Sequence, residues 1–368
     1  MLTVAGAGMA GLSAAARARQ LGLEVRVLEK GDRAGGSMRL SSCIVWRFRS
    51  LERFFEECPG GDRALQRLVF ERLDGALDWL EGLGAPVVTR ETGNPLTVGR
   101  RFDPRGLTDA LVRAAGDVRL REPLPESVDG PLVLATGGFQ GSRELVDRHV
   151  APAVPLLLRA NPWSAGDGLA AGLARGAALT AGMDEFYGRN MADVQLDESG
   201  FVPLAQVYGR FATVVNERGE PFFDGPVSWS ENDLVQATAR QPGGSAWYLL
   251  DERTLSERVR ERTVAQVVDA ARAAGGTVLP AAELPFGTPV GAVVGVRVRA
   301  AITHTIGGLR VDERARVLGS DGEPIGGLLA CGADVGGIST GGYASGLAAA
   351  LVLGLAAAET AAGRQGIT

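Results

Sequence analysis

Apolar and polar residues alternate along the chain in patterns that predict short strands separated by helices. At the N-terminus, residues 2–5 are mostly apolar, residues 9–20 are rich in alanine, and residues 24–28 alternate between polar and apolar. Short apolar runs bounded by glycine are typical of strands, so this order predicts a strand, a helix and a second strand. Apolar residues spaced three and four apart predict helices within residues 51–83 and over residues 106–115.

Four later segments extend this pattern. The apolar run 131–135 predicts a buried strand that ends in a glycine turn, and helices are expected over residues 166–179 and 252–274. Residues 345–362 consist mainly of alanine and leucine, which raises the question of a membrane span. Because this segment also contains glycines and the charged Glu359, we expect a buried core helix and no membrane span.

The amino-acid composition changes twice along the chain. Aromatic and charged residues are more frequent between residues 181 and 286, whereas both ends are rich in glycine and alanine. A chain of 368 residues is long for a single compact core. We therefore predict an α/β protein whose first domain is formed by residues 1–180 and 288–368, with residues 181–287 inserted as an α+β domain.

The first predicted turn has the spacing of a nucleotide-binding loop. Gly6 permits a tight turn, Gly8 lets a pyrophosphate approach the backbone, and Gly11 lets the helix pack closely on the strand. The N-terminus of the helix then presents free N–H groups to the phosphates. Glu29 ends the second strand, at the spacing where a carboxylate accepts hydrogen bonds from an adenosine ribose. These features together predict a Rossmann-like domain that binds an adenine dinucleotide.

Composition narrows the possible partners and the compartment. The net charge of −5 and the pI near 5.4 argue against a nucleic-acid partner, which needs a basic face. The three cysteines show neither metal-site spacing nor a paired framework. We therefore expect a reducing, cytoplasmic compartment, and we expect no signal peptide before the first strand.

Several further segments resemble the flavoprotein family of fumarate reductases and 3-ketosteroid dehydrogenases. Residues 35–46 are similar to the family's GGS…LSGG…W segment, and residues 135–139 read Ala-Thr-Gly-Gly-Phe. Gly166-Asp167-Gly168 is a third matching block. Residues 332–343 align with the GND…GGxY pattern of the ketosteroid dehydrogenase branch, with Ala333 in place of asparagine. The likeness covers both ends of the chain and is thin across residues 181–287.

This resemblance implies that the dinucleotide is FAD. Family members with covalent flavin carry a histidine near the GGS segment, and this chain has none there, so the FAD is expected to be non-covalent. The helix after residue 345 would stabilise negative charge on the reduced flavin through its dipole. The glycine loop and the family segments together place the cofactor contacts at Gly6, Gly8, Met9, Ala10, Gly11, Glu29, Lys30, Gly35, Gly36, Ser37, Leu40, Ser41, Ser42, Ala135, Thr136, Gly137, Asp167, Gly332, Asp334, Gly346 and Leu347.

Three candidate catalytic residues follow from the same resemblance. Tyr343 matches the tyrosine whose hydroxyl holds the substrate's keto oxygen in ketosteroid dehydrogenases, together with a backbone N–H from Gly346 or Leu347. Ser345 is an alternative donor, because a Tyr-x-Ser pattern occurs in relatives that act on the steroid Δ4 bond. His304 lies in a segment similar to the HTMGG of fumarate reductases, where histidine binds a carboxylate; a neutral histidine can also donate to a keto oxygen.

The proton donor or base is harder to identify. The family's catalytic arginine or tyrosine aligns with Trp229, and an indole cannot transfer a proton. Tyr208, which aligns with a proton-relay arginine of fumarate reductases, is our candidate, with Arg210 or Arg189 lowering its pKa. The arginine that clamps a second substrate carboxylate has no counterpart in residues 341–346, which disfavours a dicarboxylate.

The sequence as a whole predicts an FAD-dependent oxidoreductase acting on CH–CH groups. It would transfer a hydride between flavin N5 and a C–C bond next to a ketone, in an apolar substrate such as a steroid-like polycycle. One alternative is a fumarate-reductase-like ene reductase of a small enone or carboxylate, with His304 leading. A second is an FAD-binding protein without redox turnover, and a non-flavin NAD dehydrogenase is a remote third. The electron acceptor is unknown, with a quinone, oxygen or a protein all open.

Overall fold

The computed structural model describes residues 1–152, 154–287 and 290–363, and the chain divides into two compact units. The first unit comprises Met1–His149, Asn161–Glu185 and His304–Thr368, and the second comprises Val150–Ala160 and Phe186–Thr303. The second unit is longer than the insertion expected from the sequence. The reason is strand β15 (Val294–Thr305), which pairs with strands of the second unit over most of its length.

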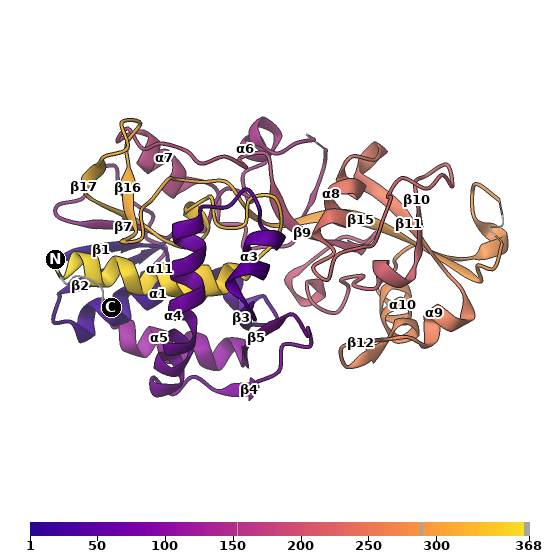
Figure 1. Ribbon diagram of the computed structural model, residues 1–368, viewed down its shortest axis with the longest axis horizontal. Helices are drawn as coiled ribbons and strands as arrows, with labels where there is room; N and C mark the ends of the chain where they lie inside the picture. The colour runs from indigo at the N-terminus through magenta and orange to yellow at the C-terminus, as the bar shows by residue number, and fades with distance from the viewer. Residues whose placement is uncertain (153, 288–289, 364–368) are drawn as a thin grey trace. The chain divides into compact units, whose positions relative to one another are not determined.

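The first unit is built on a six-stranded sheet with the order β16-β17-β7-β1-β2-β6. Its strands run parallel except for β16, which is antiparallel to β17. Both ends of the chain therefore contribute strands to this sheet, with β7 between β1 and β17 (Figure 1), and the predicted α/β class is confirmed. The bounds are β1 Leu2–Ala5, β2 Val25–Glu29, β6 Val118–Leu120, β7 Leu132–Leu134, β16 Arg316–Leu318 and β17 Pro324–Ala330.

Helices of the first unit follow the apolar periodicity read from the sequence. They are α1 Met9–Gln20, α2 Gly36–Arg39, α3 Leu51–Glu57, α4 Arg63–Gly82, α5 Pro104–Ala115, α6 Arg143–His149, α7 Asp167–Leu173 and α11 Gly346–Ala361. A small antiparallel sheet has the order β3-β5-β4, with bounds β3 Ile44–Phe48, β4 Val87–Thr89 and β5 Thr97–Phe102. Helix α7 ends at Leu173 and not near Leu179, because Gly176 adopts a positive φ and Ala177 bridges to Gly319.

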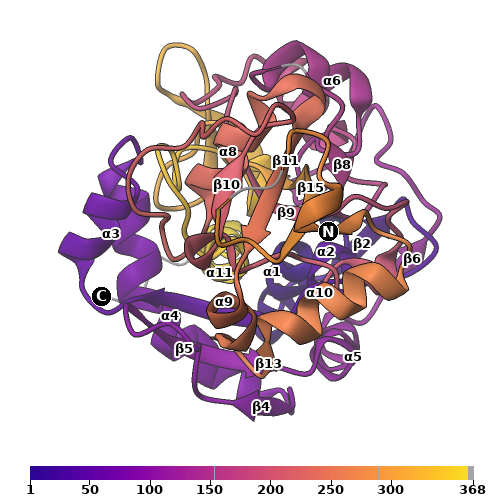
Figure 2. The same cartoon turned by 90° about the vertical axis from the view of Figure 1, so that its right-hand side faces the viewer.

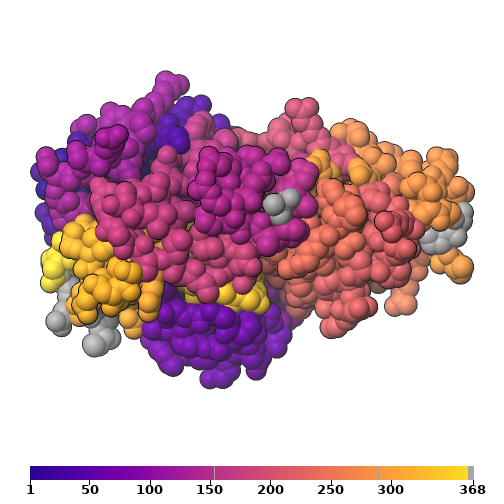
Figure 3. Space-filling model, turned by 90° about the horizontal axis from the view of Figure 1, so that it is seen from above, coloured from indigo at the N-terminus to yellow at the C-terminus, as the bar shows by residue number. Residues whose placement is uncertain are grey.

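Helix α11 packs against α1 and α4, and almost every residue from Ala348 to Glu359 is buried. The space-filling view shows yellow atoms of the C-terminal region between those of earlier segments (Figure 3). A Cβ on Gly354 would lie 2.5 Å from the Ala10 carbonyl oxygen, so the two helices touch through their backbones. Among the described residues, no helix is long and apolar enough to span a bilayer.

The second unit contains a sheet with the order β10-β11-β15-β14, to which β8 and β9 add through β15 (Figure 2). Its strands are β8 Leu157–Leu158, β9 Phe186–Ala192, β10 Thr213–Val215, β11 Ser245–Leu250, β12 Arg258–Val259, β13 Arg262–Thr263 and β14 Val278–Pro280. Its helices are α8 Asn232–Ala239, α9 Glu252–Ser256 and α10 Val264–Ala273. Short 3₁₀ turns occur at Glu198–Gly200, Gly209–Phe211, Pro242–Gly244 and Ala281–Glu283, and in the first unit at Gly332–Asp334.

The single helix predicted over residues 252–274 is wrong. Residues 258–263 form an antiparallel pair of short strands, with Arg260 in the left-handed region at φ 57°. Thr263 then starts a new helix through a capping box with Gln266.

Among the described residues of the second unit, Glu231 carries a buried carboxyl group. Glu231 is 4 % exposed, and its backbone is in the left-handed region at φ 52°. Burial raises the pKa of Glu231 to about 7, opposed by the positive charges of Arg189 and Arg210 and by the N–H groups of Arg210 and Gly209. Desolvation therefore outweighs the attraction of two guanidinium groups at this position.

The contact between α1 and α11 yields a stability prediction. We expect Gly354→Ala to lower the free energy of unfolding by about 1–3 kcal/mol, because the added Cβ would force the helices apart. Gly75, in the interior of α4, is the matched control: a Cβ there meets nothing within 4 Å. Gly75→Ala should be neutral or stabilise by up to about 1 kcal/mol, since alanine favours helix. Urea unfolding of both variants measures the difference, and equal effects would contradict the packing argument.

The buried Glu231 yields a pH prediction. Its folded-state pKa, about 7, lies above the ordinary value of 4.5, so the folded protein holds the proton over this range while the unfolded chain has released it. The free energy of unfolding therefore falls as the pH rises between these values. Glu231→Gln should remove this pH dependence. The fall in the free energy of unfolding that it abolishes is roughly 1–3 kcal/mol between about pH 4.5 and about pH 7.

Urea unfolding at several pH values measures this slope. Glu283→Gln, which changes an exposed glutamate in the same unit, should leave the slope unaltered. A Glu231→Gln protein whose stability still follows the wild-type pH dependence would show that Glu231 is ionised at neutral pH.

Candidate functional site

The first glycine loop has the geometry that a pyrophosphate requires. Gly6 has φ +104°, and a Cβ there would lie 2.1 Å from the Ala135 carbonyl oxygen; a Cβ on Gly11 would lie 1.9 Å from the Gly6 oxygen. A Cβ on Gly8, in contrast, would meet nothing within 4 Å. Helix α1 starts at Met9 without a side-chain cap or an acidic residue in its first turn. Its N–H groups are thus available to an anion, and the loop fits the dinucleotide.

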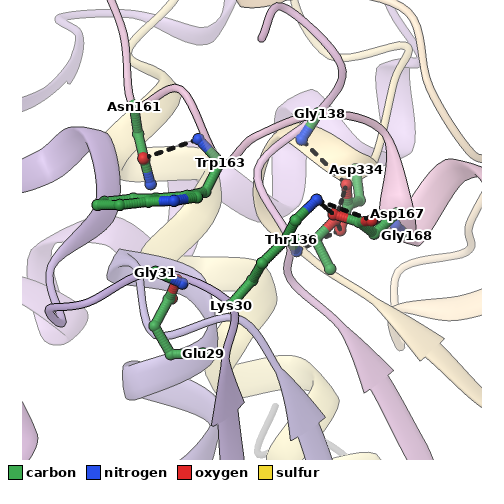
Figure 4. A network of polar contacts seen from close by, with 10 residues as sticks. All are labelled: Glu29, Lys30, Gly31, Thr136, Gly138, Asn161, Trp163, Asp167, Gly168 and Asp334. Carbon is green, nitrogen blue, oxygen red and sulfur yellow. Dashed lines mark hydrogen bonds and ion pairs between the residues drawn. The ribbon is translucent and has the colours of Figure 1, made fainter. Parts of the chain in front are cut away.

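Glu29 ends strand β2 with its carboxylate held by backbone groups. One oxygen accepts the Ala7 N–H at 2.8 Å and the other accepts the Gly31 N–H at 2.7 Å, the latter drawn in Figure 4. Each carboxylate oxygen keeps a further lone pair, which a ribose hydroxyl can use. Beside it, Lys30 pairs with Asp167 at 2.9 Å, so these two predicted contacts hold each other.

Sequence reasoning missed Trp163 in this region. A Cβ on Gly31 would lie 2.6 Å from the Trp163 ring, which therefore covers the residue after Lys30. The Trp163 N–H donates to the side chain of Asn161 at 3.1 Å (Figure 4). The long separation in sequence between Gly31 and Trp163 left no local signal for this contact.

The second glycine segment lies beside the first loop. The Gly35 N–H donates to the Ala7 carbonyl at 2.7 Å, and a Cβ on Gly36 would lie 3.2 Å from the Gly8 Cα. The Ser37 hydroxyl accepts the Asn161 N–H at 3.2 Å. Leu40, Ser41 and Ser42 follow α2 and lead to β3, and the Ser41 hydroxyl bonds locally to Met38 and Cys43.

Asp334 links three turns of the first unit through its buried carboxylate (Figure 4). It accepts hydrogen bonds from the N–H and hydroxyl of Thr136 and from the Gly138 N–H at 3.0 Å, and Thr136 in turn accepts the Gly168 N–H at 2.9 Å. Burial raises the pKa of Asp334, against the effect of these donors. The carboxylate thus orders the turns at Ala135–Gly138; whether it also contacts FAD stays a prediction.

Three of the four predicted catalytic residues gather at the start of α11. Ser345 caps the helix by accepting the Ala348 N–H at 3.3 Å, and it also accepts the Trp46 N–H at 3.5 Å. The Tyr343 ring centre lies 5.8 Å from that of Trp46 and 6.1 Å from that of His304. Gly346 and Leu347 lie in the first turn of the helix. Gly332 lies against Ala10 instead: a Cβ on Gly332 would be 2.9 Å from the Ala10 Cβ.

The hydrogen bonds of His304 determine what the ring can do. Its Nδ1 lies 3.0 Å from the Thr305 carbonyl oxygen, which can only accept, so the neutral ring carries its proton on Nδ1. Burial lowers the pKa of His304 and favours this neutral form. Nε2, which faces Gly346, then holds a lone pair. The expectation that a neutral His304 donates to a keto oxygen is corrected, because in this tautomer Nε2 accepts a proton.

The interpretation of Tyr208 as proton carrier does not fit the structure. Tyr208 is fully buried in the core of the second unit, its hydroxyl donates to Gln206 at 2.7 Å, and its ring contacts Tyr248. Burial raises the pKa of Tyr208, and the charge of Glu231 raises it further, so Tyr208 cannot act as a base near neutral pH.

Trp229, at the position expected for proton transfer, is 43 % exposed and stacks on the Arg210 guanidinium at 3.9 Å. The sequence offered no sign that Glu231, two residues later, is the buried carboxyl group of this unit. Nothing in the local pattern distinguishes it from a solvated glutamate at a helix start.

Comparisons with known proteins agree with this geometry. The model of the FAD binding domain family matches residues 2–122 and 126–348. A probable fumarate reductase, Ifc3 of Shewanella frigidimarina, is 25 % identical over 415 residues, which cover 91 % of this chain and 70 % of the relative.

Two solved structures share the fold. The open conformation of a flavocytochrome c3 fumarate reductase superposes with a TM-score of 0.73 and 22 % identity, covering 99 % of this chain and 78 % of that one. The 3-ketosteroid Δ4-(5α)-dehydrogenase of Rhodococcus jostii RHA1 gives a TM-score of 0.70 and 21 % identity, covering 98 % and 96 %. The chain belongs to the FAD binding domain family and is an FAD-dependent oxidoreductase.

Proposed function

We propose that this protein transfers a hydride between FAD and the C–C bond next to a ketone in an apolar substrate. The observation that carries the proposal is the meeting of Tyr343, His304 and Ser345 at the N-terminus of α11. FAD, when bound, supplies the hydride donor or acceptor at N5. The first unit is assigned as the FAD-binding domain and the second as the substrate domain.

Tyr343 is the residue that would polarise the carbonyl. Its ring is half-buried and held edge-on by Trp46, which fixes the direction of the phenol. A hydrogen bond from the phenol O–H to the keto oxygen stabilises negative charge there and makes the α proton more acidic. Ser345 keeps its hydroxyl hydrogen available for the same purpose, because both of its defined bonds are accepted and not donated.

His304 would accept or return the α proton through Nε2. The Nδ1–H bond to Thr305 orients the ring, and its lowered pKa keeps Nε2 unprotonated near neutral pH. Donor and acceptor groups therefore stand together, as removal of an α proton next to a polarised carbonyl requires.

The apolar substrate class rests on what the glycine loop lacks. Residues 336–348 contain no arginine or lysine, so the loop offers no cation for a carboxylate. One structural relative is named as a 3-ketosteroid-Δ4-(5α)-dehydrogenase in complex with 4-androstene-3,17-dione, which is an apolar ketone.

A second candidate is reduction of a small enone or carboxylate. It is favoured by the curated relatives, several of which are fumarate reductases at 25 % identity. A protonated His304 would have to hold the carboxylate, and its lowered pKa opposes this role. Loss of redox turnover is the remaining alternative, with FAD bound but no substrate able to bleach it.

The proposal predicts the effect of removing the Tyr343 hydroxyl. Tyr343→Phe should lower turnover more than about tenfold, because the ring stays while the donor to the keto oxygen is lost. FAD content, read from the visible flavin absorbance, should not change. Turnover is measured anaerobically by bleaching of the flavin with saturated 3-ketosteroids, and by reoxidation of photoreduced protein with the matching enones and with fumarate.

Bleaching or reoxidation by ketones alone supports the apolar class, whereas reoxidation by fumarate alone supports the second candidate. A flavin that none of these compounds affects would favour lost turnover. Unchanged turnover in Tyr343→Phe would refute the role of this residue.

The two histidines of the chain provide a matched pair for testing the base. Because burial lowers the pKa of His304 below the ordinary 6.5, wild-type kcat/KM should fall only on the acid side of that value. His304→Gln should lose this limb together with most of the activity, whereas His149→Gln should keep both. His149 packs on Phe139 at a ring distance of 5.5 Å and has no part in the site. NMR titration of the ring protons measures the pKa directly, and a value above 6.5 for His304 would contradict the assignment.

A further inference from the structure

Glu185 contacts both segments that carry the proposed catalytic side chains. One of its carboxylate oxygens accepts the Gly341 N–H at 2.7 Å, two residues before Tyr343. Its main-chain carbonyl accepts the Ile306 N–H at 3.1 Å, two residues after His304. A single residue thus fixes the loop of one candidate and the strand end of the other.

The loop before Tyr343 also contacts residues 57–60, partly through backbone groups. A Cβ on Gly342 would lie 1.8 Å from the Glu57 carbonyl oxygen, and the Gly60 N–H donates to the Thr340 carbonyl at 3.0 Å. Gly341 itself has φ +82°. The loop therefore rests against the residues after α3 and is tied on the opposite side by the charged side chain of Glu185.

The segment that carries Glu185 is itself well placed to hold His304. The Glu185 N–H closes a turn on Gly182, and a Cβ on Gly307 would lie 2.5 Å from the Met183 backbone. Glu185 is also the last residue of the first unit before the chain enters the second, and His304 is the first residue after its return. The contact thus lies where the chain crosses between the units.

The carboxylate of Glu185 is partly desolvated at this position. Burial raises the pKa of Glu185, with a smaller contribution from Asp184, while the Gly341 N–H opposes the shift. An exposed glutamate would avoid this desolvation, and a hydrogen bond to a charged acceptor is about twice as strong as a neutral one. The hydrogen bond from the Gly341 N–H therefore offsets part of the cost of burying the Glu185 carboxylate.

We propose that Glu185 is a positioning residue that holds the Tyr343 loop and the His304 strand end at a fixed separation. Glu185 touches neither substrate nor FAD in this scheme, and its effect on turnover passes through Tyr343. The inference therefore rests on the proposed function, while the loop contact itself can be tested without any activity.

The test compares Glu185→Ala and Glu185→Gln with Asp184→Ala in the FAD-loaded protein. Glu185→Ala should speed deuterium exchange in the peptide that contains Gly341 several-fold and lower kcat/KM by about tenfold to a hundredfold, as expected for a misplaced catalytic group. Glu185→Gln should keep the deuterium exchange rate and kcat/KM close to those of the wild type, because the amide oxygen of glutamine still accepts the Gly341 N–H. Asp184→Ala removes the neighbouring exposed carboxylate and should change neither.

The double variant Glu185→Ala/Tyr343→Phe separates this inference from the proposed function. If Glu185 acts through Tyr343, its loss should cost little once the hydroxyl is absent. Unchanged deuterium exchange in Glu185→Ala would overturn the positioning role whatever the activity. Faster exchange with a Tyr343→Phe enzyme that is fully active would instead retain the contact and overturn the function assigned to Tyr343.

Discussion

The first unit depends on the absence of side-chain volume around Ala10. Gly354 of α11 and Gly332 of the turn after β17 both approach this residue so closely that a Cβ would clash, at 2.5 and 2.9 Å. These contacts bring the last helix of the chain onto the first. The glycine loop that suits the pyrophosphate and the helix start that carries Ser345 therefore belong to one rigid packing arrangement, although more than 300 residues separate them.

Three buried acids of the protein differ in the partners that surround their carboxyl groups. Glu359 lies in the apolar helix α11 but pairs with Arg72 at 2.8 Å and Arg17 at 3.3 Å, so its charge is compensated inside the unit. Asp334 is satisfied by backbone N–H groups, which makes it a clamp on the glycine turns. Glu231 of the second unit lies near Arg189 and Arg210 and accepts the N–H groups of Arg210 and Gly209, yet burial raises its pKa to about 7, and burial raises the pKa of Asp334 as well. Backbone and guanidinium partners thus offset the desolvation of these two carboxyl groups only in part.

The sequence predicted what depends on local spacing. The first loop, the adjoining helix and Glu29 were identified correctly in position, because each glycine there has a steric role readable from its neighbours. Features that depend on distant packing were missed: Trp163 over Gly31, the burial of Tyr208, and the carboxylate of Glu231. The hairpin at residues 258–263 was missed although it is local, because the pattern of residues 252–274 was interpreted as one continuous helix.

The proposed roles of Tyr343, Ser345 and His304 favour an uncharged substrate. Tyr343 and Ser345 offer neutral O–H donors, and His304 is held neutral by burial and by its Nδ1–H bond to Thr305. A carboxylate placed among such groups would lose its hydration without gaining an opposite charge, which costs several kcal/mol by the usual order of magnitude for a buried ion. A ketone needs only a hydrogen bond, and its developing negative charge appears beside preorganised donors. The carboxylate of Glu185 accepts the Gly341 N–H, and it can order the loop through this main-chain contact.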